Sequence, residues 1–357
     1  KAVSSEENLQ NAGVKRASIH PRHINRLKVL GVVLTAFGVG LFGYFVWSVG
    51  LRDILGNIER FGIAGFVVIL FIYFLRILMR ATAWRLSVYD PYKLELRDTV
   101  PAVIIGEAMS SMIPLGILVS GTTKAVAVRK RVPLVVGLSS VATENLFYSF
   151  TTSIFLMLGA LTFLRNFQLD DGWRISIDVL VGVLGVLLVA GVIMVIKQWH
   201  FASELCERLY RRGILTGVLE HGRSEVRLFE NLIYGFYRRH PKRFLPICLA
   251  EAAFHILGVL EVWFILGRLG DSALLLNAFL LESVSRLITI VFKLVPFVVG
   301  VDEAGAQFVG ETIAAGVGIG VTLAIIRKGR ILFWTAVGLV LIVKRGLSLK
   351  DIKSARA

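Results

Sequence analysis

Cysteine is scarce in this 357-residue chain, and the signature motifs of several enzyme classes are missing from it. The two cysteines, Cys206 and Cys248, cannot form a disulfide framework, and no Cys-x-x-Cys pair or His/Cys cluster suggests a zinc site. The sequence contains no Walker A motif, no nucleophile elbow and no His-Glu-x-x-His motif. We therefore expect no ATP hydrolysis within this chain, no bound metal and no cofactor.

Acidic residues are also few, with 25 Asp and Glu against 40 Lys and Arg, which gives a formal net charge of +15. The chain is nevertheless 55% hydrophobic, and apolar runs of near-spanning length recur along it. A run of about 20 apolar residues crosses the roughly 30 Å hydrocarbon core of a bilayer. The composition therefore excludes a soluble multidomain protein and predicts an all-α polytopic membrane protein. The excess positive charge is assigned to membrane-facing loops rather than to a surface that binds nucleic acid.

Six segments are predicted to cross the membrane, and the strongly basic loops between them all fall on one side. The positive-inside rule makes that side the cytoplasm, so both tails, 1–26 and 346–357, are placed there around a single transmembrane domain at 27–345. Residues 52–60 form a short amphipathic connection at the far interface. The six predicted crossings are 29–51, 61–87, 133–164, 179–196, 244–266 and 318–343.

The segment 197–243 is the longest polar stretch between the predicted crossings, and it is strongly basic. Apolar residues recur along it at helical spacing, which predicts one or two amphipathic helices lying on the anionic cytoplasmic leaflet. The alternative interpretation is a solvated helix that packs on the bundle.

Two further apolar segments, 99–124 and 272–314, are interrupted by charges, Pro and Gly, so that their pieces are too short to cross. We predict that each forms a re-entrant helical hairpin, which membranes tolerate where its backbone faces protein or a wet cavity. Each follows a crossing and precedes a long helix with a central charge. This plan defines two repeats, about 61–164 and about 244–343, of opposite topology. Inverted repeats with broken helices are typical of transporters that bind their substrate near the midplane.

Ionisable residues inside the predicted crossings and hairpins are the candidates for a binding site, because each costs a few kcal/mol in hydrocarbon and needs a partner or water. Arginine forks suit phosphate, carboxylates suit an amine, and backbone amides at the two hairpin tips would add anion donors. The alternative is a set of internal salt bridges that hold the hairpins against the long helices. The candidate substrate-binding residues are Arg80, Glu107, Pro114, Gly121, Lys124, Glu144, Glu282, Arg286, Pro296, Gly300, Asp302, Glu303, Arg327 and Arg330.

Other polar residues in the apolar segments receive different interpretations. Arg76 and Arg85 fit interfacial anchors whose side chains extend toward the cytoplasm. His255 fits a hydrogen-bonded core histidine, with a proton relay to Glu251 as the alternative. Most of the aromatic side chains are assigned to the lipid-facing surface or to the interface.

Four segments of this chain resemble the transmembrane region of lysylphosphatidylglycerol synthases and their stand-alone flippase-like relatives. They read RILMRATAWRL at 76–86, IIGEAMSSMIPLGILVSGTTKAVAVRKRVP at 104–133, SSVATENLFYSF at 139–150 and KLVPFVVGVDEAGAQF at 293–308. In such relatives a Pro-Gly hairpin leads to a Gly-Glu-x-x-Arg-like element; here Thr122 stands in place of the Glu and Lys124 in place of the Arg. A later Pro-x-x-Gly-Gly-x-Gly-x-x-Glu-like element keeps Pro296, Gly300 and Glu303 with fewer glycines.

The resemblance implies a flippase that moves a polar-headed lipid, a phospholipid or an aminoacylated phospholipid, between the leaflets of a bacterial inner membrane. Its partners would be membrane lipids with anionic or zwitterionic head groups, and a homo-oligomer is compatible with the sequence. The bifunctional members carry their aminoacyl-transferring activity in a soluble C-terminal domain, so we expect no enzyme activity here. The main alternative is an ion-coupled transporter of a small soluble solute; a lipid-modifying enzyme and a non-transporting scaffold are the others.

Overall fold

The computed structural model confirms the all-α class: in the residues that it describes, the chain forms helices and no strand. Both tails, most of the predicted crossing at 29–51, and the two hairpin prolines, Pro114 and Pro296, lie outside these residues. The structure describes residues 40, 43–44, 47–112, 116–166, 171–197, 200–212, 226–227, 230–231, 234–270, 274–291, 298, 300–312 and 318–344.

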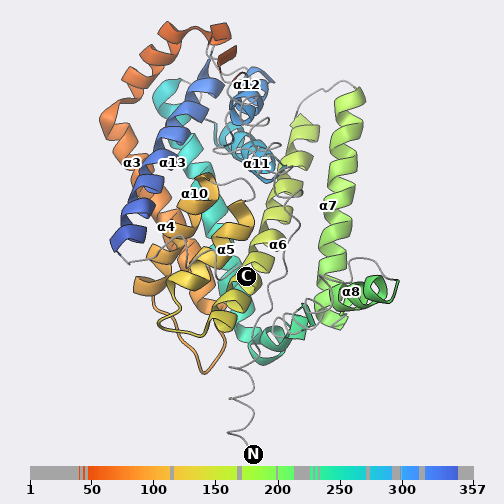
Figure 1. Ribbon diagram of the computed structural model, residues 1–357. Helices are drawn as coiled ribbons and strands as arrows, with labels where there is room; N and C mark the ends of the chain where they lie inside the picture. The colour runs from red at the N-terminus through yellow and green to blue at the C-terminus, as the bar shows by residue number, and fades with distance from the viewer. Residues whose placement is uncertain are drawn as a thin grey trace, which may run out of the picture.

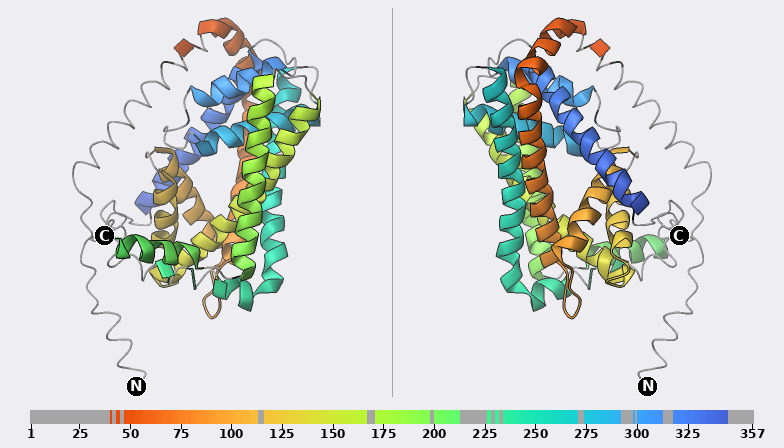
Figure 2. Two further views of the ribbon diagram at one scale, coloured as in Figure 1. Left: turned by 90° about the vertical axis from the view of Figure 1, so that its right-hand side faces the viewer. Right: turned by 90° about the vertical axis from the view of Figure 1, so that its left-hand side faces the viewer.

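The first long helix, α3 (Leu51–Leu86), bends at Gly62, where φ is 68° and ψ is 171°. A positive φ of this size is adopted readily only by glycine, which has no Cβ. The bend separates the segment predicted as an amphipathic connection, 52–60, from the segment predicted as a crossing, 61–87. Figure 2 shows the first part of α3 lying across the top of the molecule and the second part running down through it.

Four long helices form the body of the molecule: α3, α6 (Leu134–Asn166), α10 (Phe244–Leu269) and α13 (Ile319–Lys344). α10 follows a short 3₁₀ turn, η1 (Pro241–Arg243), and packs along α3. The largest apolar core joins α3, α10 and α13 through residues such as Ile69, Val262 and Leu323. α7 (Asp171–Lys197) packs on α6 at one side of the molecule (Figure 1). The boundaries of these helices lie close to those of the predicted crossings, apart from an earlier start of α7.

Two pairs of shorter helices complete the bundle. α4 (Leu96–Met112) packs on α5 (Gly116–Ala127), and α11 (Leu275–Val291) packs on α12 (Val301–Thr312). These pairs occupy the two segments that the sequence predicts to be broken. Figure 1 shows α4 and α5 in the lower half of the molecule and α11 and α12 in the upper half.

The packing of the helices follows a regular correspondence between the two halves of the chain. If α3, α4, α5 and α6 are exchanged with α10, α11, α12 and α13, every packed pair among these eight helices has a packed counterpart. For example, α4 packs on α13 just as α11 packs on α6, and α5 packs on α6 just as α12 packs on α13. Each short pair therefore contacts both α6 and α13: α5 packs on α6 and α4 on α13, while α11 packs on α6 and α12 on α13.

Among the described residues, three helical segments are long and apolar enough to cross a membrane: Leu51–Leu86, Leu134–Asn166 and Pro241–Leu269. α13 has 26 residues but carries Arg327, Lys328 and Arg330 near its centre. α7 contains a shorter apolar stretch, Ile177–Ile193. The chain thus has membrane-spanning helices, and the count of six crossings remains a prediction.

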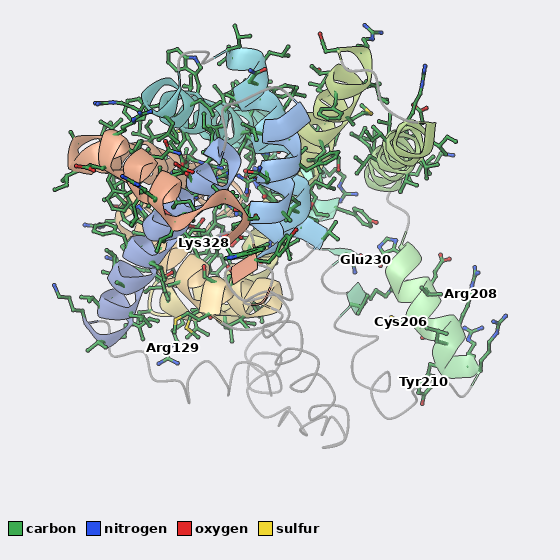
Figure 3. All side chains as sticks on the ribbon, turned by 90° about the horizontal axis from the view of Figure 1, so that it is seen from above. Arg129, Cys206, Arg208, Tyr210, Glu230 and Lys328 are labelled. Carbon is green, nitrogen blue, oxygen red and sulfur yellow. The ribbon has the colours of Figure 1, made fainter. Side chains whose placement is uncertain are left out.

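The basic segment 197–243 contains α8 (Phe201–Arg211), an amphipathic helix that lies beside the bundle rather than within it (Figure 3). The Ser203 hydroxyl donates to Glu230 Oε2 at 2.6 Å, which ties the start of α8 to the rest of the segment. Arg208 on α8 is 72% exposed and pairs with Glu204 at 3.7 Å. The structure thus contains one of the predicted amphipathic helices.

Close packing of α13 on α12 depends on Gly320. A Cβ at this position would lie 2.3 Å from the carbonyl oxygen of Ala306, whereas a Cβ at Gly182 in α7 would meet nothing within 4 Å. We expect Gly320→Ala to destabilise the protein by about 1–3 kcal/mol, because an overpacked contact with backbone cannot relax by a rotamer change. Gly182→Ala should leave stability unchanged or raise it slightly. Thermal unfolding midpoints in detergent would check this; equal midpoints for the two variants would contradict it.

Candidate functional site

Arginine side chains from three helices converge on a cavity of about 190 Å³ inside the bundle. A cavity that holds a single water has a volume of about 10–15 Å³, so this cavity has room for a polar group of several non-hydrogen atoms. Its lining comes from both halves of the chain. The lining includes the arginines Arg76, Arg80, Arg286, Arg327 and Arg330, the acids Glu107 and Asp302, and the aromatic residues Tyr73, Tyr148 and Phe254.

Glu282 on α11 is a fully buried carboxylate that holds three of these arginines. Its Oε1 accepts from Arg76 Nη2 at 3.0 Å and from Arg286 Nη2 at 2.6 Å. Its Oε2 accepts from Arg327 Nη2 at 2.7 Å. Gly258 on α10 leaves the space for this carboxylate, because a Cβ there would lie 2.4 Å from Oε1. One carboxylate thus orients guanidinium groups from α3, α11 and α13.

Glu261 on α10 is a second fully buried carboxylate that holds two arginines. It accepts from Arg76 Nη1 at 3.1 Å and from Arg330 Nη1. Arg76, only 1% exposed, therefore bridges Glu261 and Glu282. The prediction that Arg76 is an interfacial anchor is wrong, because its side chain faces α10 and α11. Arg85, by contrast, is exposed.

A third buried carboxylate, Glu144 on α6, holds two cations behind the cavity wall. Its Oε1 accepts from Arg80 Nε at 3.1 Å and Arg80 Nη2 at 2.7 Å, and its Oε2 lies 3.6 Å from Lys124 Nζ. Lys124 on α5 is itself 2% exposed. The structure thus brings three predicted site residues, Arg80, Lys124 and Glu144, into one cluster, of which Arg80 reaches the cavity.

The remaining predicted site residues divide between the cavity and packing positions. Glu107 lines the cavity and accepts a hydrogen bond from the Tyr73 hydroxyl at 2.9 Å. Asp302 also lines it, with Oδ1 buried and without a hydrogen-bond partner in the described ranges. Gly121 lies on α5 next to α6, outside the cavity lining, and a Cβ there would make an ordinary van der Waals contact with Val141 at 3.5 Å.

Of the backbone amides predicted as anion donors at the second hairpin tip, 296–300, that of Gly300 is not free. Glu303, the third residue of α12, accepts the Gly300 N–H at 2.8 Å through Oε2, as a capping glutamate does. Its Oε1 pairs with Lys328 Nζ at 2.6 Å. Gly300 itself has a φ of 81° and begins the turn into α12. Glu303 therefore caps α12 at Gly300 and links α12 to α13, and neither residue is part of the cavity lining.

Four guanidinium nitrogens around the cavity are buried and have no hydrogen-bond partner within the described residues. Leaving a buried donor unpaired costs about 1–3 kcal/mol, and more for a charged group. A ligand with several acceptor oxygens, such as a phosphate group, would satisfy donors of this kind with charge-assisted bonds. The four nitrogens are Arg76 Nε, Arg286 Nε, Arg327 Nη1 and Arg330 Nε.

Aromatic rings support the guanidinium groups from the sides. The centre of the Phe254 ring lies 4.5 Å from the Arg76 guanidinium carbon and 5.1 Å from the Arg286 guanidinium carbon. The ring of Tyr73 lies 4.1 Å from the Arg330 guanidinium carbon, and Tyr148 lies 4.4 Å from that of Arg80. These cation–π contacts stabilise the cations that line the cavity.

The site contains residues that sequence reasoning did not select, namely Arg76, Glu261 and the three aromatic residues. Glu261 carried a usable signal, because an isolated carboxylate within an apolar helix requires a buried cation. The aromatic rings carried no such signal, since lipid-facing aromatic residues are common.

His255 is a core histidine as predicted, with Nε2 3.0 Å from Thr152 Oγ1. In the described part of the chain, no group of three His, Cys, Asp or Glu side chains is placed to hold a metal ion.

Removing the charge of Glu282 should be strongly destabilising. Glu282→Gln leaves three buried guanidinium groups short of a counter-charge, and breaking a buried pair typically costs about 3–5 kcal/mol. The matched control is Glu95→Gln, whose carboxylate is exposed and pairs with Arg97 at the surface, where such pairs contribute about 0–1 kcal/mol. Thermal unfolding of the purified proteins would check this, and a Glu282→Gln protein as stable as the control would refute it.

A family model described as the lysylphosphatidylglycerol synthase TM region matches residues 28–339. Searches of curated proteins and of solved structures returned no match. The matched range covers α3 to α12 and most of α13 and includes the whole cavity lining. It also includes the four segments in which the sequence resembles this group. The chain belongs to the lysylphosphatidylglycerol synthase TM region family.

Proposed function

We propose that this protein moves a polar-headed lipid between the leaflets of a bacterial inner membrane and holds its head group in the arginine-lined cavity. The observation that carries the proposal is one cavity lined by five arginines, four of which keep a buried nitrogen that has no hydrogen-bond partner among the described residues: Arg76, Arg286, Arg327 and Arg330. Donors on four convergent side chains suit one phosphodiester group, whose oxygens accept hydrogen bonds from several directions. The family supports a role in lipid chemistry or lipid movement.

The cavity also offers acceptors for a cationic part of a head group. Glu107 and Asp302 line the same space as the arginines. A carboxylate that faces a cavity binds an ammonium group by a charge-assisted hydrogen bond. A phospholipid or an aminoacylated phospholipid would therefore find both kinds of partner in one cavity.

For the architecture we propose six crossing helices and two re-entrant hairpins, α4–α5 and α11–α12, arranged as inverted repeats with both termini in the cytoplasm. The paired packing of the two halves supports this arrangement. α5 and α12 have 12 residues each, which is about 18 Å of helix against a hydrocarbon core of about 30 Å. Non-spanning helices at this depth fit hairpins that face a polar cavity.

In this mechanism the head group travels through protein while the acyl chains stay in lipid. The site lies between the two repeats, because its lining comes from α3, α4 and α6 of one half and from α10, α11, α12 and α13 of the other. A rocking motion of one repeat against the other would open the cavity to each leaflet in turn, as in other inverted-repeat carriers. We propose that this chain carries lipids without synthesising them.

Translocation can be measured in proteoliposomes with phosphatidylglycerol labelled on an acyl chain and an impermeant quencher. We expect the wild-type protein to expose inner-leaflet label to the quencher. Arg327→Lys keeps a cation beside Glu282 but removes the planar fork. We expect translocation to slow about tenfold or more, since a hydrogen bond to a charged group contributes about 1.5–3 kcal/mol.

The matched control is Arg208→Lys on the exposed face of α8, which should translocate at the wild-type rate. Failure of the wild-type protein to accelerate exposure of phosphatidylglycerol, phosphatidylethanolamine and aminoacylated phosphatidylglycerol would overturn the proposal. Uptake of a soluble phosphate ester in place of a lipid would favour a carrier of small solutes instead.

A further inference from the structure

Glu251 on α10 is a buried carboxyl group that the proposed head-group site does not use. Its side chain is 0% exposed, and neither carboxyl oxygen has a hydrogen-bond partner in the described ranges. The other buried carboxylates among these residues all have a partner: Glu144, Glu261, Glu282 and Glu303 form ion pairs, and Glu230 accepts from Ser203. An ionised carboxylate without direct partners is costly in such surroundings.

The groups facing Glu251 come from three other helices. Arg80 of α3, Lys124 of α5 and Glu144 of α6 act on it electrostatically. On α10 itself, Cys248 lies about one turn before Glu251, and His255 lies one turn after it. Nearby on α6, Tyr148 stacks against the Arg80 guanidinium. The cations of α11 and α13 that approach α10, Arg286, Arg327 and Arg330, are paired with Glu282 and Glu261.

The charges of this cluster balance when every member is ionised. Arg80 and Lys124 contribute two positive charges, and Glu144 and Glu251 contribute two negative charges. Arg80 alone of the four lines the cavity. An anionic group that binds Arg80 from the cavity would therefore give this buried cluster an excess negative charge. In a low-dielectric interior such an excess is unfavourable, and protonating one carboxylate removes it.

We propose that Glu251 takes up one proton when a phosphodiester group binds beside Arg80, so that the anion and the proton bind to this protein together. The inference rests on the proposed function, in which the cavity receives the head group. Glu251 is the carboxyl that gains the proton because Glu144, the other carboxylate of the cluster, is held by two cations. The bound phosphodiester and the added proton together carry no net charge, which lowers the cost of moving them across the membrane.

The sign of the pH dependence follows from linkage. Above the pH at which Glu251 ionises in the free protein, the complex holds one more proton than the free protein, and raising the pH weakens binding by up to tenfold per pH unit. Binding would strengthen with rising pH only if the complex held fewer protons than the free protein. A phosphodiester does not itself titrate near neutral pH, so the pH dependence reports on the protein.

The experiment is calorimetry on the full chain with two probes: short-chain phosphatidylglycerol, and dimethyl phosphate, which has the same charged group without acyl chains. Comparing buffers with different ionisation enthalpies gives the number of protons taken up per bound probe. At a pH high enough to ionise Glu251 in the free protein, we expect about one proton for the wild-type protein and none for Glu251→Gln, whose affinity should no longer vary with pH. Glu95→Gln, which removes an exposed carboxylate far from the cluster in sequence, should behave as the wild-type protein does.

The outcomes separate this inference from the proposed function. Binding of phosphatidylglycerol by the wild-type protein without proton uptake, or uptake that persists in Glu251→Gln, overturns the role of Glu251 and leaves the lipid site standing. Proton-coupled binding of dimethyl phosphate alone supports the coupling and overturns the choice of a lipid. Binding of neither probe overturns both. If Glu251→Gln does not fold, the comparison of buffers on the wild-type protein still decides whether a proton is taken up.

Discussion

The pairing of buried charges is the constraint on which the rest of this structure depends. Arg76 bridges Glu261 and Glu282, and these two carboxylates in turn hold Arg286, Arg327 and Arg330. Four helices, α3, α10, α11 and α13, are thereby joined through charged groups inside the bundle. A buried ion pair does not have to add net stability, but separating its members leaves a costly unpaired charge. The network therefore specifies how these helices meet.

The same network also orients the guanidinium groups. Each carboxylate uses only some of the donors of its arginines, and Arg76, Arg286, Arg327 and Arg330 each keep a buried nitrogen without a hydrogen-bond partner in the described residues. The rings of Tyr73, Tyr148 and Phe254 restrict the guanidinium planes further. A site of this kind is organised before a ligand arrives, so little ordering is needed on binding. Its lining is divided between the two halves of the chain, which suits a site that opens first to one side and then to the other.

Much of the helical framework was predictable from hydropathy. The boundaries of α6, α10 and α13 lie close to the predicted ones, and the two short pairs occupy the segments rich in Pro, Gly and charge. Site residues were harder to predict, because an ionisable residue in an apolar run shows that a partner exists but not which one. Glu303 illustrates this: from the sequence it resembled a site residue, yet it caps α12 and pairs with Lys328. Arg76 resembled an anchor, yet it lies at the centre of the network.

Local properties of the chain were therefore readable in advance, since the length of an apolar run, the presence of a charge and a helix-breaking residue act through neighbours in sequence. Hydropathy established a helical membrane protein with too many internal charges to be incidental. Which charges meet depends on contacts between residues far apart in the chain, such as Arg76 with Glu261 and Arg327 with Glu282. Only the packing of α3, α10, α11 and α13 determines those distances, and with them which cations are neutralised and which donors remain for a ligand.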